Sequence, residues 1–148
     1  AAQAARAAKA PTTLGATYLA MEGPQFSTRA ESALYRQWGC DVIGMTAMPE
    51  AKLAREAELP YALVGMVTDY DCWRTEEAGV EVTDVLRVLN DNAALARRLV
   101  LEFIALLPSE RTASPIDTCL DHALITAQEA RDPETVARLD AVAGRLLR

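Results

Sequence analysis

The chain has 148 residues, of which 51% are hydrophobic and 24% are charged. This balance is typical of a folded protein with room for one ordinary domain, and it excludes a disordered chain. Lys and Arg total 15 against 21 for Asp and Glu, so the formal net charge is −6. That charge argues against a nucleic-acid partner, which needs a basic surface. The apolar runs are far shorter than the roughly 20 residues of a membrane helix, and no leader with a cleavage site is visible. We therefore expect a cytoplasmic protein with no membrane partner.

The first part of the chain alternates short apolar segments with a helical pattern. Residues 17–21 and 41–45 are apolar, are too short for helices and predict strands. Between them, Thr28 and Glu31 have the spacing of a capping box, which predicts the start of a helix. Gly39 is expected to end that helix.

Helical periodicity covers much of the remaining chain. The predicted helices are, in chain order, the end of an Ala-rich helix in residues 1–10, a helix over 50–58 with Pro49 in its first turn, and helices over 82–107 and 133–147. A near-continuous apolar run over residues 61–67 predicts a central strand buried on both faces.

Strands that alternate with helices in this way predict an α/β fold with a mostly parallel or mixed sheet. About three strands make a small sheet for such a fold. We therefore expect residues 1–148 to be the C-terminal part of a single larger domain, incomplete at its N-terminus.

Candidate ligand-binding residues follow the predicted strands, because α/β proteins bind ligands at the carboxyl ends of their strands. Asp69 and Asp71 follow the third strand, and two interpretations fit them. They bind a polar ligand, or they cap turns in a solvated loop. Phe26 could lie across a flat ligand or pack in the core, and Met45 and Thr46 are strand-end residues that could touch a ligand.

Cysteine and histidine point to no metal or redox chemistry. Cys40, Cys72 and Cys119 are widely spaced with no C-x-x-C pair, and His122 is the single histidine. This pattern indicates neither a zinc site nor a disulfide framework. We expect no metal and no cofactor.

Three motifs carry a family resemblance. They are E-G-P-Q-F-S-T-R-A-E-S at 22–32, D-V-I-G-M-T at 41–46 and T-D-Y-D-C-W at 68–73. In this order and spacing they resemble the C-terminal half of the trimeric purine nucleoside phosphorylase family, in the branch that acts on 5′-methylthioadenosine. The resemblance implies a three-layer phosphorylase/hydrolase-like α/β fold with a mixed sheet flanked by helices. It also implies a homotrimer and a pentosyltransferase of purine salvage, which uses phosphate to release adenine and 5-methylthioribose 1-phosphate.

The resemblance assigns roles to nine residues. They are Phe26, Met45, Asp69, Tyr70 and Asp71 for the purine nucleoside, Thr46 for phosphate, and Ser27, Val82 and Val85 for specificity. Asp69 is the candidate catalytic residue that gives a proton to purine N7, and Asp71 would hold the exocyclic amino group. Inorganic phosphate would be a co-substrate, and no cofactor is implied.

Two alternatives stay open. The family's phosphate site also uses a Gly-rich loop and an Arg-His pair, which these 148 residues do not contain, so the chain could be a truncated non-catalytic paralogue or assembly module. A phosphorylase for 6-oxopurine nucleosides, such as methylthioinosine or inosine, is the second alternative. The carboxylates favour adenine, because they accept hydrogen bonds from a 6-amino group, whereas a 6-oxo group prefers an amide that can donate.

Overall fold

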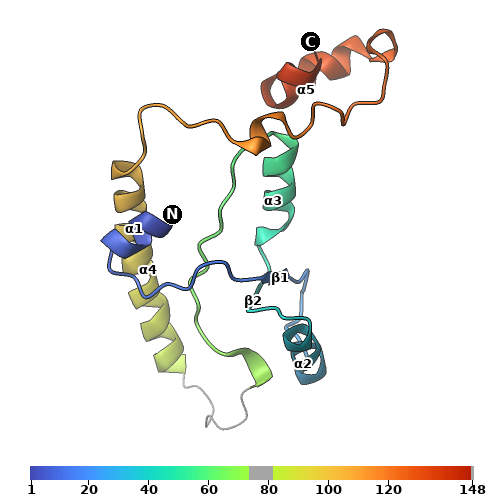
Figure 1. The fold of residues 1–148 in the computed structure, drawn as a ribbon. Helices are drawn as coiled ribbons and strands as arrows, with labels where there is room; N and C mark the ends of the chain where they lie inside the picture. Colours follow the sequence, from blue (N-terminus) through green and yellow to red (C-terminus); the bar gives the residue numbers. More distant parts are fainter. Residues whose placement is uncertain (74–81, 148) are drawn as a thin grey trace. The chain divides into compact units, whose positions relative to one another are not determined.

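The computed structural model describes residues 1–73 and 82–147, with side chains from residue 86 onward in the second range. Figure 1 shows the elements in chain order. They are α1 (Ala2–Ala7), β1 (Tyr18–Ala20), α2 (Arg29–Gln37), β2 (Val42–Gly44), α3 (Ala47–Glu56), the 3₁₀ turn η1 (Asp71–Trp73), α4 (Val82–Ala105), the 3₁₀ turns η2 (Pro115–Thr118) and η3 (Gln128–Ala130), and α5 (Pro133–Leu147).

The chain folds into two compact units, each built from two separate segments. Unit 1 contains Ala1–Met45 and Leu63–Ser109, and unit 2 contains Thr46–Ala62 and Glu110–Arg148. The sheet belongs to unit 1, whereas α3 and α5 belong to unit 2.

The sheet of unit 1 is formed by β1 and β2, which run parallel with Tyr18 paired to Val42 and Ala20 to Gly44. A parallel pair needs a crossover, and α2 supplies it. Backbone hydrogen bonds from Asp41 to Thr17 (2.9 Å) and from Met21 to Gly44 (3.0 Å) extend the pairing at both ends. The two predicted strands and the α/β fold class are confirmed, and the carboxyl ends of both strands meet at one edge.

The local signals for α2 are also confirmed. The Thr28 hydroxyl accepts from the Glu31 amide, and the Glu31 carboxylate accepts from the Thr28 amide at 2.6 Å. These two bonds satisfy amide groups that a helix start leaves unpaired. Gly39 follows the helix with φ +79°, a conformation that glycine adopts without strain.

Alanine packs the interface between α1 and α4 in unit 1. Ala4, Ala5 and Ala8 of the first segment are buried together with Leu99 of α4, and the two helices lie side by side in Figure 1. Small side chains let the backbones approach closely, so a helix of only six residues gains stability from tertiary packing.

The prediction of a buried strand over residues 61–67 is wrong. These residues form no strand, and Leu63, Val64 and Val67 are exposed, Val67 by 61%. A strand buried on both faces needs neighbouring strands and covering helices. Within the described residues the sheet has only β1 and β2, and neither pairs with this segment. The apolar run therefore lies outside the sheet, with most of its side chains exposed.

The remaining helices lie close to their predicted positions. Helix α5 has the predicted bounds, and α4 ends two residues before the predicted end. Helix α3 begins earlier than predicted, with Met48 in an extended conformation (φ −113°, ψ 134°) inside it. Pro49 explains this interruption, because proline disfavours the helical conformation in the residue before it.

Charged groups connect the segments of unit 2. Arg145 of α5 donates to the Glu58 carboxylate from Nε (2.6 Å) and Nη2 (2.5 Å), and Nη2 also lies 2.7 Å from Asp121. Glu58 further accepts from the Leu120 amide at 3.1 Å. The hydrogen bond from Arg145 lowers the pKa of Glu58. Helix α5 is thereby anchored to the chain just after α3.

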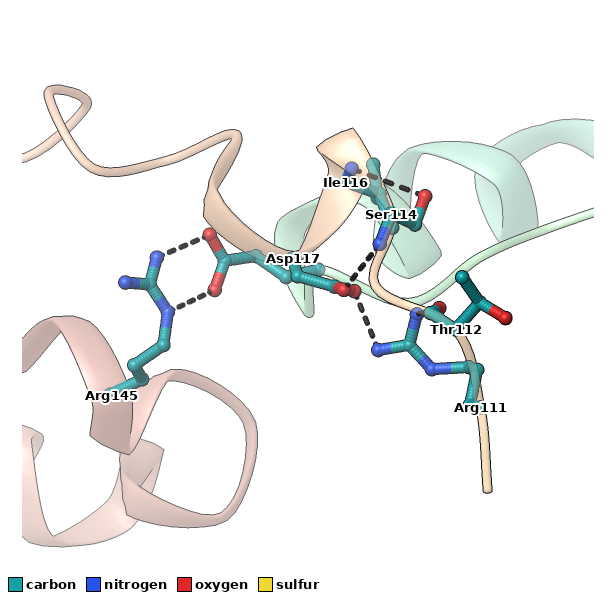
Figure 2. A network of polar contacts seen from close by, with 7 residues as sticks. Arg111, Thr112, Ser114, Ile116, Asp117 and Arg145 are labelled. Atoms are coloured by element: carbon teal, nitrogen blue, oxygen red, sulfur yellow. Dashed lines mark hydrogen bonds and ion pairs between the residues drawn. The ribbon is translucent and has the colours of Figure 1, made fainter. Parts of the chain in front are cut away.

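A second polar cluster fixes the loop before η2. Figure 2 shows Arg111 and the Ser114 amide directed at the carboxylate of Asp117, with distances of 2.6 Å and 2.8 Å. These hydrogen bonds lower the pKa of Asp117, with the Arg111 bond contributing most. The loop therefore has local order, although it is largely exposed.

Candidate functional site

The candidate site starts at the edge where β1 and β2 end. After β1 the chain turns at Gly23, which has φ +77°. The Met45 thioether, just after β2, occupies the space that a side chain at Gly23 would take. Glycine is therefore required here twice, for its conformation and for its lack of a side chain. The turn brings the β1 and β2 exits into contact.

Residues 68–73 form a tight turn, called here the acidic turn, which is held by hydrogen bonds from its own side chains. Asp69 accepts a hydrogen bond from the Thr68 hydroxyl at 2.7 Å and from the Asp71 amide at 2.8 Å. The second bond is the usual Asx arrangement, in which a carboxylate caps the amide two residues on. Asp71 itself has φ +57°, a left-handed conformation that is unfavourable for a residue with a side chain.

Helix α2 holds this turn from the side. The buried Ser32 hydroxyl donates to Oδ2 of Asp71. The Cys72 thiol lies 3.5 Å from the Ser27 carbonyl oxygen, as a weak hydrogen-bond donor, and the Ser27 hydroxyl reaches Met21 Sδ at 3.4 Å. Ser27 and the acidic turn, far apart in the sequence, are thus neighbours in unit 1.

A cavity of about 350 Å³ opens beside the acidic turn, within unit 1. Its wall is formed by Tyr18, Leu19, Ser32, Tyr35, Arg36, Cys40, Asp41, Val42, Ile43, residues 65–71 and Trp73. Polar groups in an otherwise apolar wall are typical of a small-molecule site. The three predicted residues Asp69, Tyr70 and Asp71 all line it.

Aromatic and cationic side chains are part of the cavity wall. The Arg36 guanidinium carbon lies 3.8 Å from the centre of the Trp73 ring, within cation–π range. Tyr70 meets Trp73 edge to face, with ring centres 6.1 Å apart. These contacts hold the end of the acidic turn against α2.

The other predicted site residues lie outside this cavity wall. Phe26 is 82% exposed, and Met45 packs at Gly23. Thr46 is the N-cap residue of α3 and belongs to unit 2. The side chains of Val82 and Val85 lie outside the described residues. Their roles stay predictions.

Sequence reasoning missed Ser32, Arg36 and Trp73 as parts of this site. Ser32 lies in the recognised motif, yet nothing in its spacing shows that its hydroxyl faces a carboxylate 39 residues later. Trp73 adjoins the acidic pair, which was a signal for a packing partner. Arg36 had none, because an exposed helical arginine is common.

The described residues contain neither a metal-binding cluster nor a membrane-spanning helix. In that part of the chain, no three or more His, Cys, Asp or Glu side chains are grouped as a metal site would need. None of its helices combines the length and the apolar character needed to cross a bilayer.

An α/β unit with a ligand-sized cavity and acidic residues on its wall is typical of a protein that binds a small polar ligand. The family model of the Phosphorylase superfamily matches residues 1–105. The chain belongs to this superfamily, which confirms the family resemblance that the motifs indicated.

Several relatives are similar over almost the whole chain. S-methyl-5′-thioadenosine phosphorylase of Cereibacter sphaeroides is 58% identical over 149 aligned positions, which cover 99% of this chain and 51% of that protein. The enzyme of the same name from Bradyrhizobium diazoefficiens is 59% identical over 136 positions, covering 90% and 47%. The chain thus spans about half the length of the curated relatives it matches.

Two solved structures are also similar to most of this chain and to about half of their own chains. A methylthioadenosine phosphorylase sourced from an Antarctic soil metagenomic library is 50% identical with a TM-score of 0.78, covering 86% of this chain and 44% of that one. A double mutant of adenosine/methylthioadenosine phosphorylase from Schistosoma mansoni, in complex with adenine, is 35% identical with a TM-score of 0.65, covering 78% and 47%.

Proposed function

We propose that this chain forms the purine-binding part of an enzyme that cleaves 5′-methylthioadenosine with inorganic phosphate. The products are adenine and 5-methylthioribose 1-phosphate, as in purine salvage. The observation that carries this proposal is the pair Asp69 and Asp71 in the wall of a ligand-sized cavity, on a turn that α2 holds in place. The names of relatives that are 58% and 59% identical support the same substrate.

The acidic pair suits an adenine base. The exocyclic 6-amino group can only donate hydrogen bonds at the base edge, and a carboxylate can only accept them. A 6-oxo group would leave two acceptors facing each other, which is unfavourable. A solved relative that is 35% identical carries adenine in its complex, which also supports a 6-amino preference.

The chemistry requires a proton for the departing base. A phosphate oxygen forms a bond to the anomeric carbon while the bond from that carbon to N9 breaks. The electron pair of the broken bond passes to the purine. A proton delivered to N7 neutralises the leaving base, as general-acid catalysis does. Asp69 is the proposed donor, and Asp71 would hold the amino group.

Further residues complete the nucleoside site in this proposal. Phe26 and Tyr70 would contact the base, and Met45 the ribose. Ser27, Val82 and Val85 would shape specificity, and Thr46 would bind phosphate. No metal or organic cofactor takes part.

One threonine hydroxyl does not position and neutralise a phosphate dianion by itself. Because the chain spans about half the length of its relatives, we propose that other phosphate ligands come from outside these 148 residues. The proposed enzyme is a cytoplasmic homotrimer.

The test is a phosphorolysis assay on the protein expressed from the complete reading frame that encodes this chain. We expect adenine release from 5′-methylthioadenosine that depends on phosphate, and a lower kcat/KM for methylthioinosine. Release at the same rate without phosphate would indicate a hydrolase. A preference for methylthioinosine would indicate the 6-oxopurine alternative, and no release from either nucleoside would indicate a non-catalytic protein.

A further inference from the structure

Ser32 makes one of the contacts between α2 and the acidic turn, and it is the one that reaches a carboxylate. Its residue surface is only 2% exposed, and its hydroxyl donates to Oδ2 of Asp71. The neighbouring positions Glu31 and Ala33 are both exposed. Ser32 is therefore the point at which this part of the helix meets the turn.

The hydroxyl of Ser32 does not serve the helix itself. Serine is a weaker helix former than alanine, because its side chain competes for backbone hydrogen bonds. The Ser32 amide already makes the regular bond to the Thr28 carbonyl at 2.9 Å, and its hydroxyl points across to Asp71 rather than back along α2. An alanine would serve α2 equally well, so the hydroxyl is explained by the carboxylate that it contacts.

The backbone of Asp71 is held in an unusual conformation at the same point. Lys9 and Glu58 are the other described residues with positive φ that are not glycine. Each of these two follows the end of a helix, where a left-handed residue closes the last turn. Asp71 follows no helix. Such conformations persist where surrounding contacts enforce them, and they occur often at functional sites.

Two contacts enforce the conformation of Asp71. Its amide donates to Oδ1 of Asp69 at 2.8 Å, which fixes the backbone, and Ser32 binds Oδ2, which fixes the carboxylate. Oδ1 of Asp71 has no partner among the described residues. Ser32 thus fixes the orientation of the carboxylate through one of its oxygens, and both residues line the cavity.

We propose that Ser32 is a positioning residue for base recognition, acting through Asp71. By holding Oδ2, its hydroxyl aims Oδ1 at the 6-amino group of the purine. This inference rests on the proposed function for the identity of the ligand. It adds a residue whose effect is specific: Ser32 matters for nucleosides with a 6-amino group and little for those without one.

The experiment compares two substrates in the protein expressed from the complete reading frame. One is 5′-methylthioadenosine, and the other is the same nucleoside without the 6-amino group. Ser32→Ala should lower kcat/KM for the first about tenfold to a hundredfold, the usual effect of a lost hydrogen bond to a charged group. For the second substrate the change should stay below about threefold. A merely structural role would lower both equally, and that result would overturn the proposal.

Two further variants sharpen the test. Glu31→Ala is the matched control, because it breaks the α2 capping box one residue away and leaves the Ser32–Asp71 contact in place. It should change the two substrates equally. In the background of Asp71→Asn, Ser32→Ala should add less than about threefold, because residues that act as a unit are not additive. Full additivity would contradict action through Asp71.

Adenine binding separates this proposal from the proposed function. If the parent protein does not turn over methylthioadenosine, the proposed function is wrong, and affinities for adenine and unsubstituted purine are measured by equilibrium dialysis. Ser32→Ala should then weaken adenine about tenfold or more and leave purine unchanged. Equal affinities in parent and variant would overturn the role of Ser32. A parent that binds no adenine would overturn both proposals.

Discussion

Asp69 and Asp71 are chemically identical and one residue apart, but their surroundings differ. Asp69 accepts from Thr68 and from the Asp71 amide, both within its own turn. Asp71 accepts from Ser32 on a different element. The orientation of Asp69 therefore depends on the turn alone, whereas that of Asp71 depends on how the turn packs against α2. Substitutions at the two positions should consequently have different effects on the orientation of the carboxylates.

Asp69→Asn tests the proposed proton donor while conserving the turn. The asparagine side-chain oxygen can still accept from the Asp71 amide, and its NH₂ group can donate to the Thr68 hydroxyl. The variant has no acidic proton, so turnover of methylthioadenosine should fall by about two orders of magnitude or more. Steady-state phosphorolysis measures this, with circular dichroism as the control for folding. Turnover at the parent rate would contradict the assignment.

At the scale of elements, local signals explain most of what the sequence predicts correctly. Thr28, Glu31 and Gly39 mark the ends of α2 through bonds that span only a few residues. The strands at Tyr18 and Val42 follow from short apolar segments bounded by turn residues. The prediction of a strand over residues 61–67 was wrong because burial of a strand depends on partners that are distant in the sequence. The contact of Ser32 with Asp71 was missed for the same reason.

The capping box of α2 gives a stability prediction. Thr28→Ala removes the hydroxyl that accepts from the Glu31 amide, which should cost about 1 kcal/mol. Urea unfolding of the protein from the complete reading frame, followed by tryptophan fluorescence, measures the change in the free energy of unfolding. Thr13→Ala, at an exposed loop position of the same unit, is the matched control and should have little effect. Equal loss in both variants would show that the capping box contributes nothing specific.

The Glu58–Arg145 pair gives a pH prediction for unit 2. Because Arg145 lowers the pKa of Glu58 in the folded chain, the pair stabilises the fold above the ordinary glutamate pKa. That contribution is lost as the pH falls through the lowered pKa. Arg145→Gln should therefore increase amide exchange in α5 at pH 7, and the difference from the parent should vanish under strongly acidic conditions.

The control for this pair lies on the same helix. Arg138 is exposed on α5, and Arg138→Gln removes the same charge without touching Glu58. It should leave amide exchange in α5 near the parent rate at both pH values. A pH-independent difference between Arg145→Gln and the parent would mean that the ion pair does not anchor the helix.

At the scale of the whole molecule, the chain leaves much apolar surface uncovered. Tyr61, Leu63 and Val67 are exposed, and the chain spans about half the length of its relatives. Large exposed apolar patches favour association, and unpaired extended segments favour aggregation. A cooperative monomer is therefore not expected from these 148 residues alone.

The corresponding prediction concerns the isolated 148-residue chain. It should elute as aggregates in size-exclusion chromatography, bind a hydrophobic dye strongly and release no adenine. The protein from the complete reading frame, prepared in parallel, should be monodisperse and should bind little dye. A monodisperse isolated chain that releases adenine only with phosphate would show that these residues are sufficient.

The division of the chain into interleaved units has a consequence for the order of its synthesis. Residues 46–62 lie in unit 2, but the other segment of that unit begins only at residue 110. Glu58 therefore leaves the ribosome long before its partner Arg145, by a delay on the order of ten seconds at usual elongation rates. During that time α3 has no α5 to anchor, while Ser32 and Asp71 are already both available. The acidic turn can thus form while the ribosome is still translating, whereas unit 2 must wait until Arg145 has been synthesised.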